Sequence, residues 1–241
     1  MGWDTPHSRD ETLAILERWM KKDGGRKIKM VSGGWVNKDD QSNGYMKLLN
    51  PDTDYIWHLD SDEFYMKEDL RKTREWLEKE NPTFVTIDFL HFFKNYFTVA
   101  IGGQGWGWDT PIPRIQKYYP NALYTTHRPP CISDPNGVPN EKIRPLHLSN
   151  VTGVKCFHYS YVTDKQVNEK MAYYATEFSQ VERLKTWYQN VWKGWDINRD
   201  FVENTYGTHP TAWRGSRTTS YNGPHPETME IRVHAPSVDH S

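Results

Sequence analysis

Cysteine is scarce in this chain, and long apolar runs are missing. The only two cysteines, Cys131 and Cys156, are too few for a disulfide framework and lack metal-ligand spacing, so a reducing cytosol is the expected location. No run approaches the roughly 20 apolar residues of a membrane span, and the first ten residues have no apolar core of a signal peptide. We therefore expect a cytoplasmic protein without a membrane span.

An excess of either charge is missing too. The 30 basic and 31 acidic residues give a net charge of -1. A protein that grips the nucleic-acid backbone normally carries a clear positive excess. Nucleic-acid binding is therefore not expected.

Aromatic residues, in contrast, are plentiful. They make up 14% of the 241 residues and include 11 tryptophans and 14 tyrosines. Such rings stack on sugar faces or nucleobases, but they also fill protein cores. Composition alone leaves both roles open.

Helical and strand patterns alternate in the first part of the chain. A capping-box spacing from Ser8 to Glu11 and an apolar stripe predict a helix at about 9–22, which ends at Gly24-Gly25. A short alternating run at 28–30 predicts a strand, and apolar residues around 45–49 predict a second helix.

A buried strand at 54–59 is followed by an acidic turn, an amphipathic helix at 67–80 and another strand at 84–90. This alternation predicts an α/β fold with a mixed, mostly parallel sheet flanked by helices. Ligands bind at the carboxyl edge of such sheets, which is where the acidic turn falls.

The pattern changes after residue 91. We expect a glycine- and tryptophan-rich loop at 101–113, strands at 112–119 and 154–162, a helix or helix pair at 164–192, and an extended or frayed end from residue 209. The expected divisions are a main domain at 1–162, a helical C-terminal extension at 163–208 and a proline-rich tail at 209–241.

The acidic turn holds Asp60, Asp62 and Glu63 in the order D-S-D-E. Two neighbouring carboxylates at a strand end need solvent or a cation between them. Carboxylate and water ligands suit Mg²⁺ or Mn²⁺, which typically bridge protein carboxylates to substrate phosphates. A solvated acidic turn is the alternative interpretation.

Four further pieces of sequence belong together: DYIWHLDSDEFY, HSRDETLAILERW, TTHRPP and FHYSYV. In combination they resemble a family 2-type glycosyltransferase of the GT-A fold. The resemblance implies a nucleotide-sugar donor, a glycan or other hydroxyl acceptor, and Mn²⁺ or Mg²⁺ held by Asp60 and Asp62. It also implies that His158 completes the metal shell, although a core histidine is the alternative.

The resemblance implies further donor contacts near the start of the chain. Asp10 matches an acidic residue in the turn after the family's first strand, while the alternative is that it stabilises the first helical turn. Lys38 and Asn43 fall in a segment that resembles the family's donor site, where Lys38 would pair with phosphate or else stay solvated. His127 and Arg128 are cations without an assigned role.

An inverting transfer needs a general base near the acceptor hydroxyl. Asp109, in the glycine- and tryptophan-rich loop, is the first candidate, and Asp88 and Glu63 are its rivals.

Family members normally begin with one more strand than precedes HSRDET here, so an N-terminally shortened member is expected. This motivates the alternative of a non-catalytic sugar- or nucleotide-binding protein. A metal-dependent hydrolase is a third possibility, weakened because no H-E-x-x-H motif is present. The sequence carries no signature of an oligomeric state.

Overall fold

The computed structural model describes residues 11–127, 129–134, 136–140, 143–177, 184, 186–212 and 214–234. The chain forms two compact units. Unit 1 comprises Met1–His58, Pro82–Val85 and Pro113–Leu146, and unit 2 comprises Leu59–Asn81, Thr86–Ile112 and His147–Ser241. No helix in the described part of the chain is long and apolar enough to cross a membrane.

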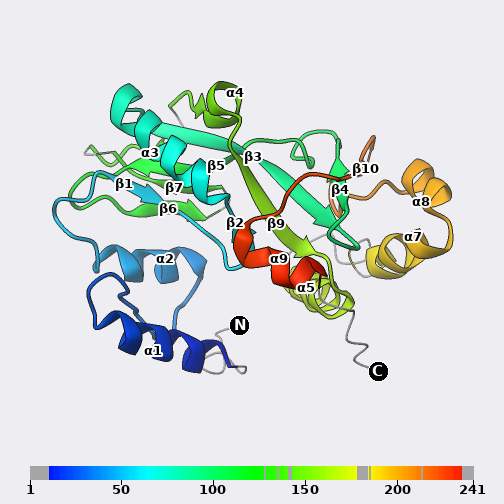
Figure 1. Cartoon of the computed structure of the whole chain (residues 1–241), viewed down its shortest axis with the longest axis horizontal. Helices are drawn as coiled ribbons and strands as arrows, with labels where there is room; N and C mark the ends of the chain where they lie inside the picture. Colours follow the sequence, from blue (N-terminus) through cyan, green and yellow to red (C-terminus); the bar gives the residue numbers. More distant parts are fainter. Residues whose placement is uncertain are drawn as a thin grey trace. The chain divides into compact units, whose positions relative to one another are not determined.

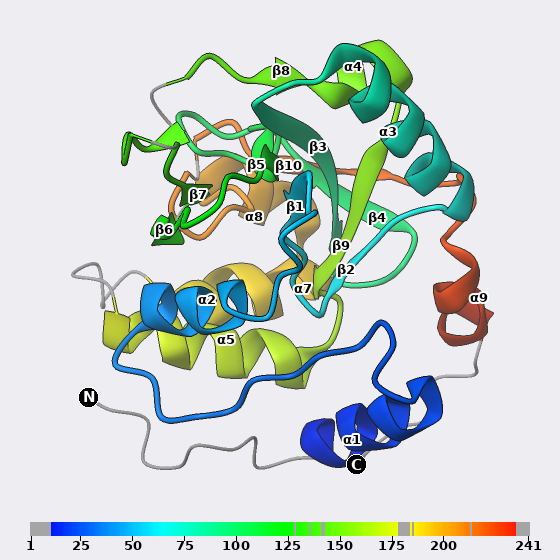
Figure 2. The same cartoon turned by 90° about the vertical axis from the view of Figure 1, so that its left-hand side faces the viewer.

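Unit 1 combines two helices with two pairs of short strands (Figure 2). Its elements are α1 (Thr12–Asp23), α2 (Lys38–Met46), β1 (Tyr55–Trp57), β5 (Ile112–Lys117), β6 (Tyr124–His127) and β7 (Pro130–Ile132). Strands β1 and β5 pair antiparallel, as do β6 and β7, and α2 packs beside β6. Its core cluster is made by Met46, Ile56, Ala122, Tyr124 and Ile132.

The predicted first helix is confirmed as α1, although Ser8 of the expected capping box lies outside the described residues. Gly24 ends the helix in the left-handed conformation, and its N–H donates to the Met20 carbonyl oxygen. The apolar stripe that predicts the helix stays exposed at Ile15, Leu16 and Trp19.

The strand expected at 28–30 is wrong, since no strand is assigned to these described residues. The backbone N–H groups of Lys27 and Ile28 donate instead to the Asp23 carboxylate. Lys29 Nζ reaches the Leu48 carbonyl oxygen. Local side-chain hydrogen bonds thus replace the sheet partner that this run requires.

Unit 2 is built around the long strand β3, whose first two residues belong to unit 1 (Figure 1). Its other strands are β2 (Glu63–Phe64), β4 (Thr98–Ile101), β9 (Lys155–Tyr161) and β10 (Arg217–Ser220), and β3 itself is Phe84–Phe93. A short strand β8 (Leu146–His147) leads directly into α4 (Leu148–Thr152). The other helices are α3 (Lys67–Glu80), α5 (Asp164–Glu177), the π-helix η2 (Tyr188–Lys193), α7 (Gly194–Ile197), α8 (Arg199–Thr205) and α9 (Glu227–His234).

The mixed sheet flanked by helices is confirmed, but it contains fewer parallel contacts than the sequence suggests. Strands β3 and β9 pair parallel, whereas β2–β9, β3–β4 and β4–β10 pair antiparallel. The short connection from β3 to β4 accounts for the antiparallel pairing of these two strands, because a few residues join antiparallel neighbours only.

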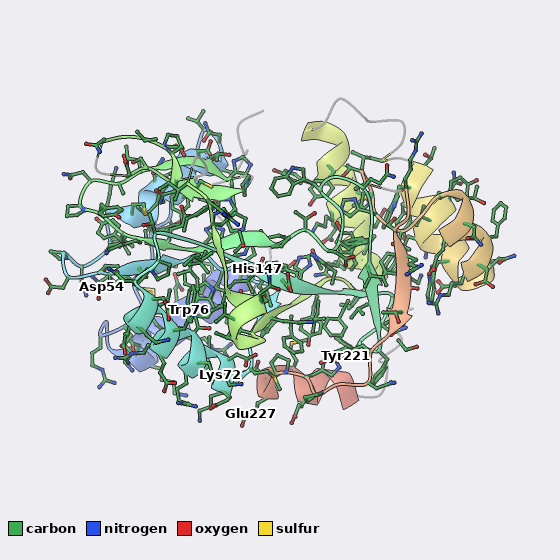
Figure 3. The ribbon with its side chains drawn as sticks, turned by 90° about the horizontal axis from the view of Figure 1, so that it is seen from above. Asp54, Lys72, Trp76, His147, Tyr221 and Glu227 are labelled. Carbon is green, nitrogen blue, oxygen red and sulfur yellow. The ribbon has the colours of Figure 1, made fainter. Side chains whose placement is uncertain are left out.

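Helix α3 matches its expected bounds at 67–80, and it buries Thr73, Trp76 and Leu77 while Lys72 stays on its exposed side (Figure 3). The helices near the carboxyl end pack a large aromatic core. Its fully or nearly buried members include Phe93, Trp108, Tyr161, Trp187 and Trp192.

Within the described residues 209–212 and 214–234, the chain forms a strand and a helix where an extended or frayed end is expected. Residues Arg217–Ser220 form β10, which gives β4 a second partner, and Met229 of α9 is buried. The chain passes from Tyr221, directly after β10, to Glu227 at the start of α9 (Figure 3). The prolines of this segment lie outside β10, so its backbone N–H groups remain available to the sheet.

Candidate functional site

The acidic motif forms a tight turn directly before β2, in unit 2. The Glu63 N–H donates to the Asp60 carbonyl oxygen over 3.1 Å, and the Asp60 N–H points at Glu63 Oε2 over 3.4 Å. Asp60 is exposed, Asp62 is half-buried and Glu63 is buried. The three carboxylates thus differ in environment, and Glu63 faces back into its own turn.

Strand β9 fixes the other side of this turn. The Tyr159 N–H donates to the Asp62 carbonyl oxygen, and Glu63 pairs with His158 across the β2–β9 ladder. As a result His158 Nε2 lies 3.7 Å from Asp62 Oδ2. The structure therefore brings together two of the residues that the sequence singles out for a metal.

That separation fits two ligands of one cation. Ligands at about 2.1 Å from a metal lie no more than about 4.2 Å from each other. A direct hydrogen bond would need a shorter contact than 3.7 Å. A carboxylate and an imidazole are both acceptable Mn²⁺ ligands.

These ligands do not form a complete cage. Within the described residues, no three His, Cys, Asp or Glu side chains are gathered closely enough to hold a metal ion. Mn²⁺ and Mg²⁺ are commonly bound by one or two carboxylates, with substrate phosphates supplying further oxygens. The residues present therefore fit a site that a diphosphate would complete.

His91 is a site residue that the sequence analysis missed. It lies on β3 in parallel register with His158 on β9, and the two Nδ1 atoms are 2.7 Å apart. The His91 side chain is buried. The available signal was a histidine in each of two aromatic strand segments, HFF and FHY, but only the strand register shows that they meet.

Trp108 joins the glycine-rich loop to this histidine pair. The centroid of its buried indole ring lies 4.9 Å from the centroid of the His91 ring and 5.1 Å from that of the Tyr161 ring. Its Nε1–H donates to the Thr208 hydroxyl over 3.0 Å. The loop that carries Asp109 is thereby anchored beside the strands that carry His91 and His158.

The same loop is closed by close backbone contacts. Gly102 has φ +74°, and a Cβ there would lie 2.4 Å from the Gly215 carbonyl oxygen. The Gly102 N–H donates to Asp109 Oδ2 over 2.8 Å, and its carbonyl oxygen accepts from the Trp108 N–H. Asp109 is exposed, with one carboxylate oxygen holding the loop together.

Asp88 lies on the other face of β3. Phe89 and His91 point to one face, and side chains alternate along a strand, so Asp88 faces away from the histidine pair. Its Oδ1 lies 2.8 Å from His147 Nε2, and its N–H donates to the Ser149 hydroxyl. His147, which is labelled in Figure 3, is the residue directly before α4. Asp88 and its His147 contact therefore lie on the opposite face of β3 from His91 and His158.

Tyr159 follows His158, and its backbone N–H donates to the Asp62 carbonyl oxygen, while its phenol oxygen lies 2.8 Å from His225 Nδ1. Burial raises the pKa of Tyr159 well above its usual value. The phenol therefore stays protonated near neutral pH and does not act as a base there.

The expected donor contacts lie in unit 1. Asn43 is tied to the backbone of β6, since its Oδ1 accepts from the Tyr124 N–H and its Nδ2 donates to the Tyr124 carbonyl oxygen. Lys38 is exposed at the start of α2, where Asp39 and Asp40 also lie. Two carboxylates beside a lysine weaken its attraction for phosphate.

Three more residues are singled out by the sequence: Asp10, His127 and Arg128. Asp10 and Arg128 lie outside the described residues. His127 Nδ1 lies 2.7 Å from Asp39 Oδ1, which gives this histidine a partner on α2.

Comparison with known proteins supports the fold. No curated protein matches the chain. The model of the family described as Glycosyl transferase family 2 matches residues 7–132, just over half of the chain. The match contains the acidic turn, Asp88 and Asp109, while His158 lies beyond it. This family domain has the GT-A fold, and the chain belongs to glycosyl transferase family 2.

Proposed function

We propose that this protein transfers a sugar from a nucleoside diphosphate donor to a hydroxyl group of a glycan or other acceptor, with Mn²⁺ or Mg²⁺ bound at Asp60, Asp62 and His158. The observation that carries the proposal is the 3.7 Å approach of Asp62 Oδ2 to His158 Nε2 beside the acidic turn. The family match supports a glycosyltransferase and a nucleotide-sugar donor.

The chain's own residues divide the work in this proposal. Asp62 and His158 would hold the cation together with the exposed Asp60. When bound, the cation would neutralise the charge that develops on the leaving diphosphate. The Gly102–Asp109 hydrogen bond orients the Asp109 carboxylate.

Asp109 is the proposed general base. It is exposed on a loop that Trp108 anchors to His91, in the same unit as the acidic turn. A carboxylate that takes the acceptor proton lets the hydroxyl attack the sugar from the side opposite the leaving group, which inverts the anomeric centre.

A second function is favoured by one observation. All three candidate bases are engaged by neighbouring groups: Asp109 by the Gly102 N–H, Asp88 by His147, and Glu63 by the Asp60 N–H. A protein that binds the nucleotide or the sugar without transferring it would need no carboxylate poised for proton transfer.

The first experiment is a thermal-shift and calorimetric screen with UDP, GDP, CDP and dTDP, each with and without Mn²⁺. A ligand that binds only the folded chain raises its melting temperature by mass action. We expect one nucleotide to stabilise the chain only when Mn²⁺ is present. The Asp62→Asn variant should lose this effect, and the matched Asp52→Asn variant, changed in an exposed turn of unit 1, should keep it.

Transfer is then assayed with the sugar-linked form of the nucleotide that binds and with mixed glycan acceptors. Metal-dependent binding followed by sugar transfer supports the enzyme. Metal-dependent binding without transfer to any acceptor, and without slow transfer to water, supports the binding protein. Nucleotide binding that is indifferent to Mn²⁺ refutes the metal site.

A further inference from the structure

His91 has no assigned role, yet its contact with His158 is short and buried. The two Nδ1 atoms are 2.7 Å apart, and His91 is only 6% exposed. At this distance the contact is a hydrogen bond, so one nitrogen carries the proton and the other accepts it. The direction of this hydrogen bond decides which nitrogen of His158 has its lone pair.

Only one direction prepares His158 for a metal. If His158 Nδ1–H donates to His91, the lone pair of neutral His158 is on Nε2, the atom 3.7 Å from Asp62 Oδ2. In the opposite direction, the proton is on His158 Nε2 and blocks that atom as a ligand. Histidines that bind metals commonly donate their second ring N–H to a neighbouring acceptor, which fixes the tautomer and the ring orientation.

The surroundings of His91 hold it in place for this contact. The centroid of its ring lies 4.9 Å from the centroid of the Trp108 ring and 5.4 Å from that of the Phe89 ring. The parallel register of β3 and β9 places it directly opposite His158. Movement of either ring is therefore limited by core packing and by the sheet.

We propose that His91 is a positioning residue that accepts the His158 Nδ1 proton and so presents the His158 Nε2 lone pair beside Asp62 for a divalent cation. This inference rests on the proposed metal site. His91 itself touches neither the cation nor the substrate.

Two substitutions separate hydrogen bonding from packing. His91→Phe keeps an aromatic ring against Trp108 but removes the acceptor. In His91→Asn, the side-chain Oδ1 falls close to the position of the imidazole Nδ1 and restores an acceptor. A residue that serves only to fill the core would tolerate Phe better than Asn, whereas a positioning residue gives the reverse order.

The test measures Mn²⁺ binding by calorimetry, together with the tautomers of the ¹⁵N-labelled histidines by two-bond ¹H–¹⁵N correlation. The His158→Gln spectrum identifies the His158 signals. We expect His158 of the unaltered chain to carry its proton on Nδ1. His91→Phe should weaken Mn²⁺ binding by about 10- to 100-fold, and His91→Asn should bind within about threefold of the unaltered chain.

The outcomes separate this inference from the proposed function. Normal Mn²⁺ affinity in a folded His91→Phe variant overturns the role of His91 and leaves the metal site intact. A proton on His158 Nε2 in the unaltered chain also overturns the role, and this measurement does not depend on whether the variant folds. Failure of the unaltered chain to bind Mn²⁺ both alone and with each of the four nucleoside diphosphates refutes the metal site and the role of His91 with it.

Discussion

The Trp108 indole N–H donates to the Thr208 hydroxyl across 100 residues of sequence, and both side chains are buried. This bond ties the loop that carries Asp109 to the segment that precedes β10. Trp108 also contacts His91, so the same indole ring supports the histidine pair. The stability of the loop and the geometry of the candidate site therefore depend on one residue.

A double-mutant cycle tests this link. Trp108→Phe leaves the Thr208 hydroxyl without its donor, and Thr208→Val leaves the indole N–H without its acceptor. Each buried polar group that loses its partner should cost about 1–3 kcal/mol in the free energy of unfolding. The double variant should cost less than the sum by about 1 kcal/mol or more, measured by urea denaturation. Strictly additive costs would show that the hydrogen bond does not contribute.

The general base is tested by comparing two aspartates. Asp109→Asn should lower the rate of transfer by about 10²- to 10⁴-fold, because an amide cannot accept the acceptor proton. Mn²⁺-dependent nucleotide binding should remain, since Asp109 is not among the proposed ligands. Asp88→Asn is the matched control, since Asp88 lies on the opposite face of β3, paired with His147. Equal loss of transfer in both variants would argue against Asp109 as the base.

Sequence reasoning succeeded where the signal is local. Helix α3 was predicted at its observed bounds, since periodicity over fourteen residues and charged pairs at helical spacing specify it without reference to the rest of the fold. The acidic turn was placed by the apolar strand segment directly before it. Both features depend on neighbours within a few residues.

The residues that were missed or misjudged depend on distant partners. His91 meets His158 only because β3 and β9 pair in a particular parallel register. The run at 28–30 has strand composition, but Asp23 captures its N–H groups. Periodicity gives no information about either the register or a competing side chain.

Acid should lower the stability of the helices near the carboxyl end by protonating the Asp164 carboxylate. Hydrogen bonds from Lys193, Tyr188 and Trp192 hold the pKa of this carboxyl down at about 2. The folded pKa is below the unfolded value, so this contribution to stability is present above about pH 4 and is lost as the pH falls toward 2. The effect should be modest, because the side chain is half-exposed and water screens its charge.

The matched variant for this titration is Asp164→Asn, which cannot ionise. The difference in melting temperature between the unaltered chain and Asp164→Asn should be largest near pH 6 and should shrink below pH 4. A difference that stays constant from pH 6 to pH 2.5 would show that the carboxylate charge is not the source of the stabilisation.

At Lys94, favourable side-chain contacts oppose the cost of an unfavourable backbone conformation. It has φ +67°, which L-residues rarely adopt, while its side chain is nearly buried. Its Nζ donates to the Trp192 carbonyl oxygen, pairs with Asp196 and lies over the Trp192 ring. These contacts join the end of β3 to η2 and α7, and they hold the residue in a conformation that costs about 1–2 kcal/mol.

Replacing Lys94 should therefore reverse the usual order of alanine and glycine. Both Lys94→Ala and Lys94→Gly lose the contacts with Trp192 and Asp196, and both should unfold at lower urea concentration than the unaltered chain. Only Lys94→Gly also relieves the positive φ, so it should be more stable than Lys94→Ala by about 1 kcal/mol. In a helix or strand, alanine is normally the more stable residue of the two. An alanine variant as stable as the glycine variant would mean that the backbone relaxes once the side-chain contacts are gone, and that these contacts, not the local chain geometry, impose the left-handed conformation.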